Sequence, residues 1–464
     1  MSKKNSLAKN TLLLSIGTFL TKGISFIMVP LFSRWLTISD YGTFDLLCTY
    51  VSLLVPMIGL ASNEAIFRFS IEKEKASEKA VYVTNGLFIF AFNSLIAFIA
   101  VAICYFVFDW KLAFYFYLLL LGEVYNIYLR GFLRGIKQLG IFAKGNVIIT
   151  ACNAVAATVF IKVFNMGLEG MILGNAIGYI VGDIIIVAIS GYVKYFNVKL
   201  FSLAEIKHMI KYSYALIPNS LAWWVINVSD RTIIKVLLGT AANGIYAVAY
   251  KIPNICSSVF STFGVSWQQA ATEMLDANER NAYYNKVYNK MLVILLSINC
   301  GVLSVNAWLF RYIFDLKYID SHLYAPILVT GTLFSSIALF YGGIQISFKM
   351  PKENGITTVI GAVVNIAVHL ACVKFIGLYA ACVSTLLSQV VVCGLRRFKL
   401  KNEVSIKFDK LSMAMIVIYI YFFASSYIIY NDIFNVINFV IAGVIFLYVN
   451  RDYANKILAK VRKK

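Results

Sequence analysis

The chain has 464 residues, of which 60% are hydrophobic and only 14% are charged, and its mean hydropathy is +0.77. These values are typical of a polytopic membrane protein and exclude an ordinary soluble globular protein. The net charge of +20 would suggest nucleic-acid binding in a soluble protein, but in a membrane protein the loops on one side account for it, so nucleic acid is not an expected partner.

Apolar runs bounded by charged or turn-forming residues predict about fourteen membrane-spanning helices. Each run is long enough to cross most or all of a hydrocarbon core of about 30 Å. The first run follows three lysines but has no cleavage site, so it is expected to be an uncleaved span. The predicted spans are residues 11–33, 42–67, 81–106, 113–133, 141–162, 168–190, 212–237, 243–268, 290–311, 323–347, 355–374, 377–395, 411–430 and 433–449.

The distribution of basic residues predicts the topology. With both termini in the cytoplasm, and with residues near the ends of spans counted with the adjoining loop, 32 of the 42 Lys and Arg residues fall on the cytoplasmic side, 7 on the outer side and 3 deeper within spans. This asymmetry follows the positive-inside rule for an even number of spans. The outer loops are short, which leaves no room for an external catalytic domain.

The two halves of the chain share a weak internal repeat. The pattern Leu-x5-Gly-x-aromatic at 36–44 recurs at 238–246, an offset of 202, and the pattern Asn-x8-Lys at 153–162 recurs at 365–374, an offset of 212. Two units of six spans then have the same orientation, an arrangement that places a transport site between them near the midplane. The predicted domains are an N-terminal lobe (1–190), a cytoplasmic connector (191–211), a C-terminal lobe (212–396), and an extra helix pair with a basic cytoplasmic tail (397–464).

The hairpin at 212–268 contains Asp230, Arg231 and Lys251 inside its apolar helices. A charge near a helix centre costs roughly 2.5–3.5 kcal/mol on insertion scales, so these side chains are expected to face protein or water. Polar residues recur at helical spacing with them, and Lys22 ends a similar polar stripe in the first span. These stripes comprise Thr11, Ser15, Thr18, Lys22 and Ser25; Asp45, Thr49, Ser52, Pro56, Gly59 and Asn63; Asn219, Trp223, Asn227, Asp230 and Arg231; and Lys251, Asn254, Ser258 and Ser261.

A wet cationic cavity lined by Lys22, Arg231 and Lys251 is therefore expected, and it suits an anionic group such as phosphate or diphosphate. The alternative is structural. Asp230 and Arg231 point about 100° apart on a helix, so either can pair with another helix for packing alone, and Lys251 can extend toward the interface.

Other membrane-embedded side chains have weaker signals. Glu123 and Asp183 are lone carboxylates that are candidates, with Asp230, for coupling to H⁺ or Na⁺ or for charge balance. Glu64 and Arg68, four residues apart, are expected to form a local ion pair or a gate.

Aromatic residues and cysteines complete the candidate residues. Trp223, Trp224 and Tyr250 are candidates for stacking on sugar rings, although most aromatic residues in such a chain serve packing. The eight cysteines lack the spacing of a metal site or a disulfide framework, and neither a metal nor an organic cofactor is expected.

A series of short motifs along the chain resembles the polysaccharide-export branch of the MOP flippase superfamily, the Wzx-type O-antigen and capsule repeat-unit flippases. The resemblance extends over essentially the whole chain. It rests on Pro30-Leu31, Arg34, Tyr41-Gly42, Gly59-Leu60, Arg68-Phe69, Asp230-Arg231, Gly239, Gly244–Tyr246 and Ala249–Pro253. The resemblance implies a two-lobed, alternating-access bundle in a bacterial cytoplasmic (inner) membrane, in which Lys22, Arg231 and Lys251 hold a diphosphate.

The expected function is translocation of undecaprenyl-diphosphate-linked oligosaccharide repeat units from the inner to the outer leaflet, without enzymatic activity. The expected partners are that polyprenyl-linked glycan, membrane lipids and the polysaccharide polymerase machinery. Three alternatives stay open: a MATE-like drug or metabolite antiporter, which would favour an acidic cavity; a polytopic polysaccharide polymerase or glycosyltransferase, which would need a large outer loop; and a peptidoglycan-precursor flippase.

Overall fold

The computed structural model describes residues 3–273, 277–428 and 430–451, without the side chains of residues 3–15 and of scattered residues between 215 and 278. Throughout this part the chain is helical and contains no strand. The helices belong to two compact units, Met1–Arg231 and Thr232–Lys464, and the boundary falls inside one helix, α9 (Ile217–Leu238). The predicted fold class, an all-α polytopic membrane protein, is confirmed.

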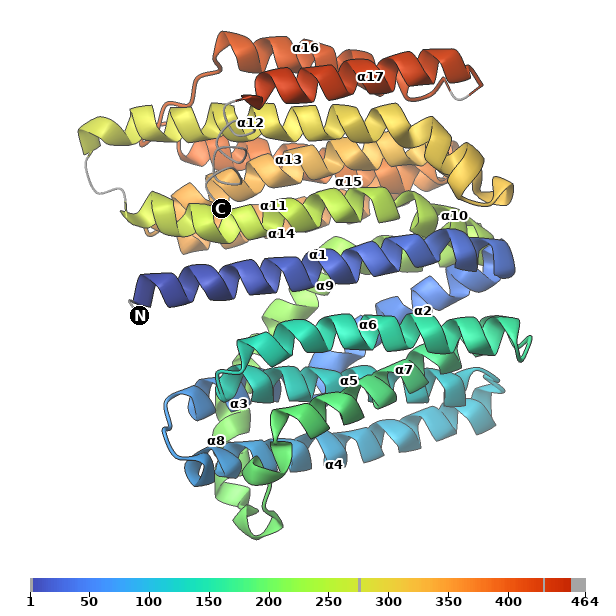
Figure 1. The fold of residues 1–464 in the computed structure, drawn as a ribbon, viewed down its shortest axis with the longest axis vertical. Coiled ribbons are helices and arrows are strands. Elements are labelled where there is room, and N and C mark those ends of the chain that lie inside the picture. Colours follow the sequence, from blue (N-terminus) through green and yellow to red (C-terminus); the bar gives the residue numbers. More distant parts are fainter. Residues whose placement is uncertain (1–2, 274–276, 429, 452–464) are drawn as a thin grey trace, which may run out of the picture. The chain divides into compact units, whose positions relative to one another are not determined.

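The first unit is built around a helix at its centre, α5, which packs against α3, α4 and α7, while α6 packs between α1 and α7 (Figure 1). Its core consists of buried apolar side chains that include Val51, Phe90, Phe132 and Ile172. The helices of this unit before α9 are α1 (Lys3–Trp35), α2 (Ile38–Ile58), α3 (Ser62–Ile71), α4 (Ala76–Phe108), α5 (Ala113–Gly135), α6 (Leu139–Lys162), α7 (Gly167–Ser190), the 3-10 turns η1 (Tyr192–Tyr195), η2 (Val198–Leu200) and η3 (Tyr214–Leu216), and α8 (Leu203–Ser213).

In the second unit α13 packs against α11 and α15, and the last two helices, α16 and α17, lie along α12 (Figure 1). After α9 the elements are α10 (Thr240–Ala249), α11 (Lys251–Glu273), α12 (Ala277–Trp308) with the π turn η4 (Leu309–Ile313), the 3-10 turn η5 (Leu316–Tyr318), α13 (Ser321–Ser347), α14 (Pro351–Ile376), α15 (Tyr379–Lys399), α16 (Lys410–Ser425) and α17 (Asp432–Val449).

All of the predicted spans correspond to helices. Among the described residues, ten helices are long and apolar enough to cross a membrane. The other predicted spans correspond to α5, α9, the pair α10–α11, and α16, which has 16 residues. Charged residues such as Glu123, Arg231 and Lys251 lower the hydropathy of α5, α9 and α11. Three of these helices thus carry candidate polar residues.

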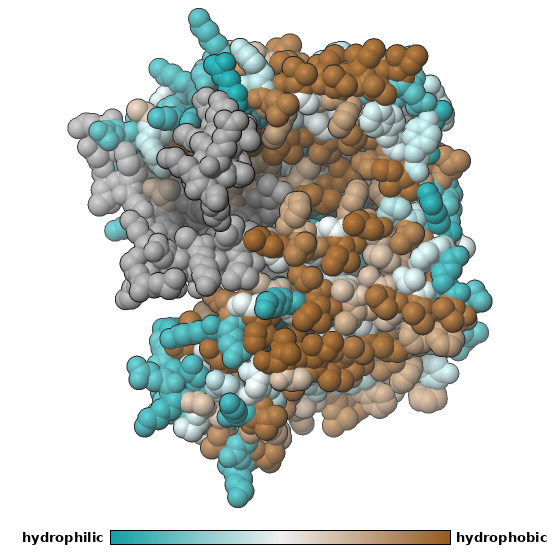
Figure 2. All heavy atoms as spheres, viewed as in Figure 1, coloured by the Kyte–Doolittle hydropathy of each residue, from teal (hydrophilic) through white to brown (hydrophobic). Residues whose placement is uncertain are grey.

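The surface matches a membrane environment. Figure 2 shows hydrophobic residues over the middle of the helices and hydrophilic residues gathered at their ends. On α4, large side chains such as Phe92, Phe106 and Phe108 are exposed at 65%, 82% and 73%. Exposed apolar area of this extent on a helix of 33 residues is expected to face lipid. The protein is a multi-pass membrane protein.

Two of the predicted spans are interrupted by breaks. The second span separates into α2 and α3 because the chain turns at Leu60 and Ala61, which have left-handed φ angles of 48° and 50°. The Ala61 amide bonds back to the Pro56 carbonyl, and Asn93 donates to the Ile58 carbonyl at 2.7 Å, which satisfies the end of α2. In the second unit α10 ends at Ala249, whose carbonyl has no intrahelical donor because residue 253 is a proline.

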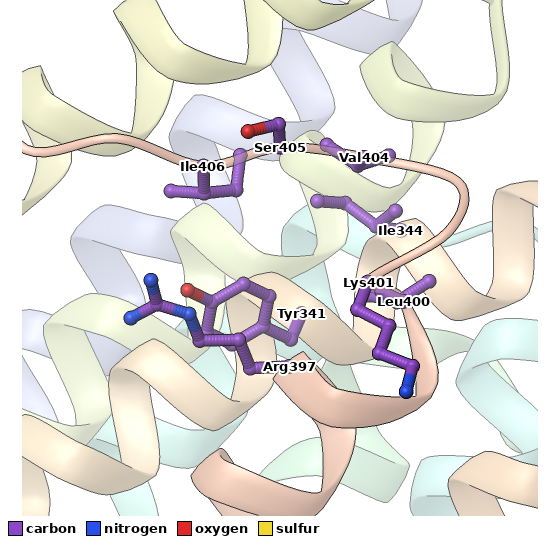
Figure 3. Close-up of a pocket in the computed structure, with 8 residues that line it drawn as sticks. All are labelled: Tyr341, Ile344, Arg397, Leu400, Lys401, Val404, Ser405 and Ile406. Carbon is purple, nitrogen blue, oxygen red and sulfur yellow. The ribbon is translucent and has the colours of Figure 1, made fainter.

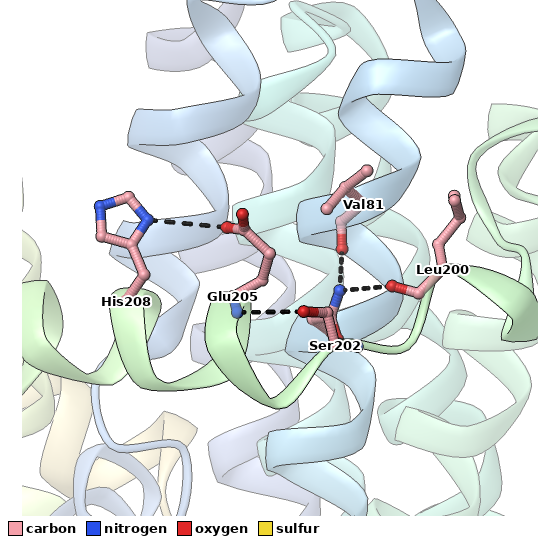
Figure 4. Close-up of polar contacts among 6 residues, drawn as sticks. Val81, Leu200, Ser202, Glu205 and His208 are labelled. Atoms are coloured by element: carbon pink, nitrogen blue, oxygen red, sulfur yellow. Dashed lines mark hydrogen bonds and ion pairs between the residues drawn. The ribbon is translucent and has the colours of Figure 1, made fainter.

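An asparagine clamp holds the loop that precedes α8 in the first unit. Asn85 of α4 donates to the Leu200 carbonyl at 2.9 Å and accepts from the Ser202 amide at 2.8 Å. Figure 4 shows Leu200 and Ser202 of this loop, with Glu205 in the first turn of α8. Ser202 in turn caps α8 by accepting from the Glu205 amide. The loop is thereby fixed to the end of a membrane helix by side-chain hydrogen bonds, together with the contact between the Phe88 and Phe201 rings.

The second unit contains the same clamp. Asn285 of α12 donates to the Ser405 carbonyl at 2.7 Å and accepts from the Lys407 amide at 2.6 Å. As in the first unit, one residue separates the two loop residues that Asn285 contacts. The loop again leads into the next helix, here α16. In each half, the helix that contains the third predicted span thus makes an equivalent contact, as a repeat of six spans requires.

Candidate functional site

A buried ion pair joins α9 to α2 in the first unit. Arg231 Nε donates to Asp45 Oδ2 at 2.6 Å, and the two side chains are 10% and 12% exposed. Seven residues earlier on α9, the Trp224 indole donates to the Thr49 carbonyl at 2.9 Å. Asp45 and Thr49 are one turn apart on α2, so α9 contacts the polar stripe of α2 at two points.

Asp45 is a further candidate site residue, which the sequence placed only in a polar stripe. It begins the polar stripe of the second span, and that position was the only sequence signal for it. Asp230, the neighbour of Arg231, is also buried, at 5% exposure. Arg231 is therefore accompanied by two carboxylates, so this part of the site is less cationic than the hairpin sequence alone implied.

Lys22 and Lys251 lie in different environments. Lys22 is exposed on α1, which packs on α6 where Gly17 approaches Ala143. Five residues correspond to about 140° of rotation on a helix, so Lys22 points away from α6. Lys251 begins α11 in the second unit and is half-buried beside the break. Joint binding of one diphosphate by Lys22, Arg231 and Lys251 stays a prediction.

The predicted pairing of Glu64 with Arg68 is wrong. Glu64 accepts from Arg134 of α5 at 2.8 Å, whereas Arg68 pairs with Glu72 one turn further along at 2.5 Å. Glu64 lies in the first turn of α3, next to Arg134 of α5. Arg134 is less exposed than Arg68, and an ion pair that is less exposed to water is stronger. The Glu64–Arg134 pair therefore joins α3 to α5 and is not a local contact.

The two lone carboxylates sit on adjacent helices of the first unit. Asp183 of α7 is 8% exposed and accepts from Asn126 Nδ2 of α5 at 3.0 Å. It lies at a cavity of about 390 Å³ that is lined mainly by apolar and tyrosine side chains. Glu123, one turn before Asn126, interacts with Tyr179 of α7 and faces Arg130. Their role in ion coupling stays a prediction.

The candidate sugar-stacking residues are only partly visible. Trp224 is half-buried with its indole bonded to Thr49, and Tyr250 is half-buried with its ring 5.7 Å from that of Tyr246. The side chain of Trp223 lies outside the described residues, as do those of Asn219, Asn227, Ser258, Ser261, Thr11 and Ser15. Sugar stacking by Trp223, Trp224 and Tyr250 stays a prediction.

Comparison with known families identifies the chain's relatives. The sequence model of the family described as "Polysaccharide biosynthesis protein" matches residues 7–271, which is more than half of the chain. The chain belongs to this family. A search of curated proteins found no match.

Solved structures show that this family member has the fold of MOP-superfamily transporters. The lipid II flippase MurJ, in an inward closed conformation, is 16% identical, matches 96% of this chain and 100% of its own, and has a TM-score of 0.71. An inward-facing multidrug resistance MATE family transporter is 13% identical over 85% of this chain and 98% of its own, with a TM-score of 0.64. A MOP superfamily transporter from Pyrococcus furiosus is 14% identical over 85% and 96%, with a TM-score of 0.53.

These matches cover nearly the full length of the solved chains, so the fold extends over both units. Each is below the identity at which function transfers, and they establish architecture alone. The MOP-type fold that the resemblance implied is thereby confirmed.

Proposed function

We propose that this protein is a flippase that moves undecaprenyl-diphosphate-linked oligosaccharide repeat units from the inner to the outer leaflet by alternating access. The observation that carries the proposal is the match to the polysaccharide biosynthesis family over residues 7–271. The MurJ-like fold supports it, because MurJ is a flippase whose cargo is lipid II, another lipid-linked molecule. On this proposal the protein is a transporter and has no catalytic residues.

In the proposed mechanism Arg231 is the principal cation for the diphosphate. A guanidinium carries five N–H donors in a planar fork that matches phosphate oxygens. In the structure Asp45 is its anionic partner, so a diphosphate would compete with or share that contact. Lys22 and Lys251 are proposed as the further cations, and Trp223, Trp224 and Tyr250 as surfaces for the sugars.

Energy for transport is proposed to come from H⁺ or Na⁺ at an acid of the first unit. Asp183 suits this role because it is buried beside a cavity and hydrogen-bonded to a neutral amide rather than to a cation. Glu123 already has Tyr179 and Arg130 as neighbours, so it is the weaker candidate. The proposed location is the bacterial inner membrane with both termini in the cytoplasm.

The ion pair allows a test that separates binding from folding. Arg231→Gln alone leaves the buried Asp45 carboxylate without its cation, so loss of export by this variant is ambiguous. The neutral double variant D45N/R231Q removes both charges at nearly constant volume. We expect it to reach the membrane at normal abundance and to lower surface glycan by about ten-fold or more, because a charge-assisted hydrogen bond to phosphate contributes about 1.5–3 kcal/mol.

The measurement uses a strain that lacks this gene and carries each variant on a plasmid. Surface glycan, the pool of polyprenyl-diphosphate-linked repeat units and the amount of protein in the membrane are quantified together. Lys235→Gln is the matched control, since Lys235 is an exposed cation one turn after Arg231 on α9. Normal surface glycan in D45N/R231Q would exclude Arg231 as a diphosphate ligand.

A second candidate function, export of organic cations, is favoured by one observation. Two buried carboxylates, Asp45 and Asp230, accompany a single Arg231, and the fold also matches a MATE family transporter. If this function holds, the deletion strain becomes sensitive to cationic drugs while its surface glycan is unchanged. The flippase proposal requires the reverse, with lipid-linked repeat units accumulating in the deletion strain.

A further inference from the structure

A small cavity lies at the basic end of the second unit, away from the residues assigned above. Its volume is about 160 Å³, and it is enclosed by the end of α13, the end of α15 and the loop that follows α15 (Figure 3). Pockets that hold drug-sized molecules measure about 300–1,000 Å³, so this cavity fits only a small group. Tyr341, Arg397 and Ser405 supply polar groups to its wall, and Ile344 and Leu400 supply apolar ones.

The Tyr341 hydroxyl is the buried polar group of the cavity. Tyr341 is 2% exposed, and its hydroxyl makes no hydrogen bond of acceptable distance and angle to any described residue. Its ring packs beside Tyr288 at 5.9 Å between centroids, near enough for the two hydroxyl groups to interact electrostatically. A ligand that accepts a hydrogen bond from this hydroxyl would give a buried polar group a strong acceptor.

Arg397 supplies a positive charge next to this hydroxyl. Figure 3 shows its side chain alongside Tyr341, with the guanidinium on the same side as the hydroxyl, whereas the Lys401 amine points away from both. Arg397 is exposed and lies over the Phe408 ring at 5.7 Å, and it has no ion pair with any described carboxylate. Its guanidinium therefore retains donors for an anion.

The adjacent Arg396 makes different contacts. The free hydrogen-bond donors of Arg397 therefore result from its position at the cavity and not from its place in a basic run of sequence. Arg396 donates four hydrogen bonds, to the Ala338 carbonyl and to the side chains of Asn354, Thr357 and Thr358. Consecutive arginines on α15 thus have opposite states. The hydrogen-bond donors of Arg396 are satisfied by protein acceptors, and Arg397 lines the cavity beside the Tyr341 hydroxyl.

We propose that this cavity binds a phosphate group through Arg397 and Tyr341. The phosphate comes either from the headgroup of an anionic phospholipid in the surrounding leaflet or from inorganic phosphate. The lipid source fits the setting, because this end of the unit carries Arg396, Arg397, Lys399, Lys401, Lys407 and Lys410, and basic segments at a membrane surface attract anionic lipid. The site is independent of the proposed flippase function.

Native mass spectrometry of the full chain in detergent tests this site. The probes are phosphatidylglycerol, phosphatidylcholine and inorganic phosphate, each titrated against the wild type and three variants. Arg397→Gln removes the charge, and Tyr341→Phe removes only the hydroxyl. Lys399→Gln is the matched control, because Lys399 is exposed in the same turn and does not line the cavity.

We expect phosphatidylglycerol to bind more tightly than phosphatidylcholine, and Arg397→Gln to weaken its binding about ten-fold, or 1.4 kcal/mol. Tyr341→Phe is expected to weaken it by several-fold, and Lys399→Gln to leave it unchanged. If inorganic phosphate binds with the same dependence on Arg397 and Tyr341 while the two lipids bind equally, the source is soluble phosphate. The proposal is overturned if neither Arg397→Gln nor Tyr341→Phe changes the binding of any probe. If Arg397→Gln does not fold, the result for Tyr341→Phe alone decides.

Discussion

The buried Arg231 and the half-buried Arg396 are stabilised in two different ways. Arg231 has a carboxylate partner, Asp45, whereas Arg396 has four neutral oxygen acceptors from α13 and α14 and no ion pair with a described residue. A charge paired with neutral acceptors keeps its full net charge, while an ion pair is neutral overall. Arg396 is thus suited to joining three helices, and Arg231 is suited to exchanging its partner for an anionic substrate.

This difference predicts a structural role for Arg396. Arg396→Ala removes four hydrogen bonds and leaves acceptors on α13 and α14 unsatisfied, so we expect the free energy of unfolding to fall by about 2–4 kcal/mol. Thermal unfolding of the purified protein in detergent measures the change. Lys399→Ala, on the exposed side of the same helix, is the control. Equal stability of the two variants would contradict a clamping role.

At the residue scale the sequence predicted that certain charges are buried but not which charges pair. Burial of Arg231 follows from its position within an apolar run, since a lone charge in lipid is costly. Its partner Asp45 lies 186 positions away in the chain, and helical periodicity carries no information on contacts between distant helices. The same reason explains why Glu64 pairs with Arg134 rather than with nearby Arg68.

At the scale of elements, α6 and α7 pack through a stripe of glycines. Gly170, Gly174, Gly178 and Gly182 recur every four residues on α7, and each faces α6. A Cβ on Gly174 would collide with the backbone of Ala157, and one on Gly178 with Asn153. Small residues at this spacing allow two backbones to approach closely in lipid, where no hydrophobic effect drives helices together.

Gly174→Ala is therefore expected to be destabilising. The added methyl group meets backbone atoms that cannot move without separating the helices, at a cost of about 1–3 kcal/mol. Gly140→Ala on α6 is the control, because nothing lies within 4 Å of the added Cβ, and alanine favours a helix. Thermal unfolding compares the two. A larger loss in Gly140→Ala than in Gly174→Ala would refute this packing interpretation.

The sequence predicted where helices cross the membrane more reliably than where they break. Long apolar runs specify spans by composition alone, and every predicted span corresponds to helix. The break after Pro56 depends in addition on left-handed backbone at Leu60 and Ala61, residues without any conformational preference for it. That conformation is maintained by tertiary contacts such as the bond from Asn93 to Ile58, which no local pattern encodes.

At the scale of the whole molecule, the internal repeat accounts for the architecture of each unit. The offset of 202 found in the sequence motifs is close to the separation of Asn85 and Asn285, which clamp equivalent loops in the two units. The two short motifs occur in the same order in both halves, and this order is sufficient to predict the repeat, because each motif is local in sequence. The contacts that build each unit are not local, and only the structure supplies them.

The orientation of the second unit in the membrane is open to a direct test. The Ser321 hydroxyl donates to the Ile245 carbonyl, so the starts of α10 and α13 lie at the same end of the unit. Since α13 has 27 residues and is about 40 Å long, Lys352, which follows it, lies at the opposite end from Thr240. The positive-inside rule assigns the Lys352 end to the cytoplasm.

Single cysteines at Thr240 and Lys352, in a chain whose eight native cysteines are replaced by alanine, are treated with a membrane-impermeant thiol reagent in intact cells. We expect Thr240→Cys to react and Lys352→Cys to react only after the cells are permeabilised, which also controls for the reactivity of each thiol. The reverse pattern would place both termini outside. Labelling of both cysteines from one side would contradict the separation that α13 imposes, because no helix of that length can have both ends on the same surface when it spans the bilayer.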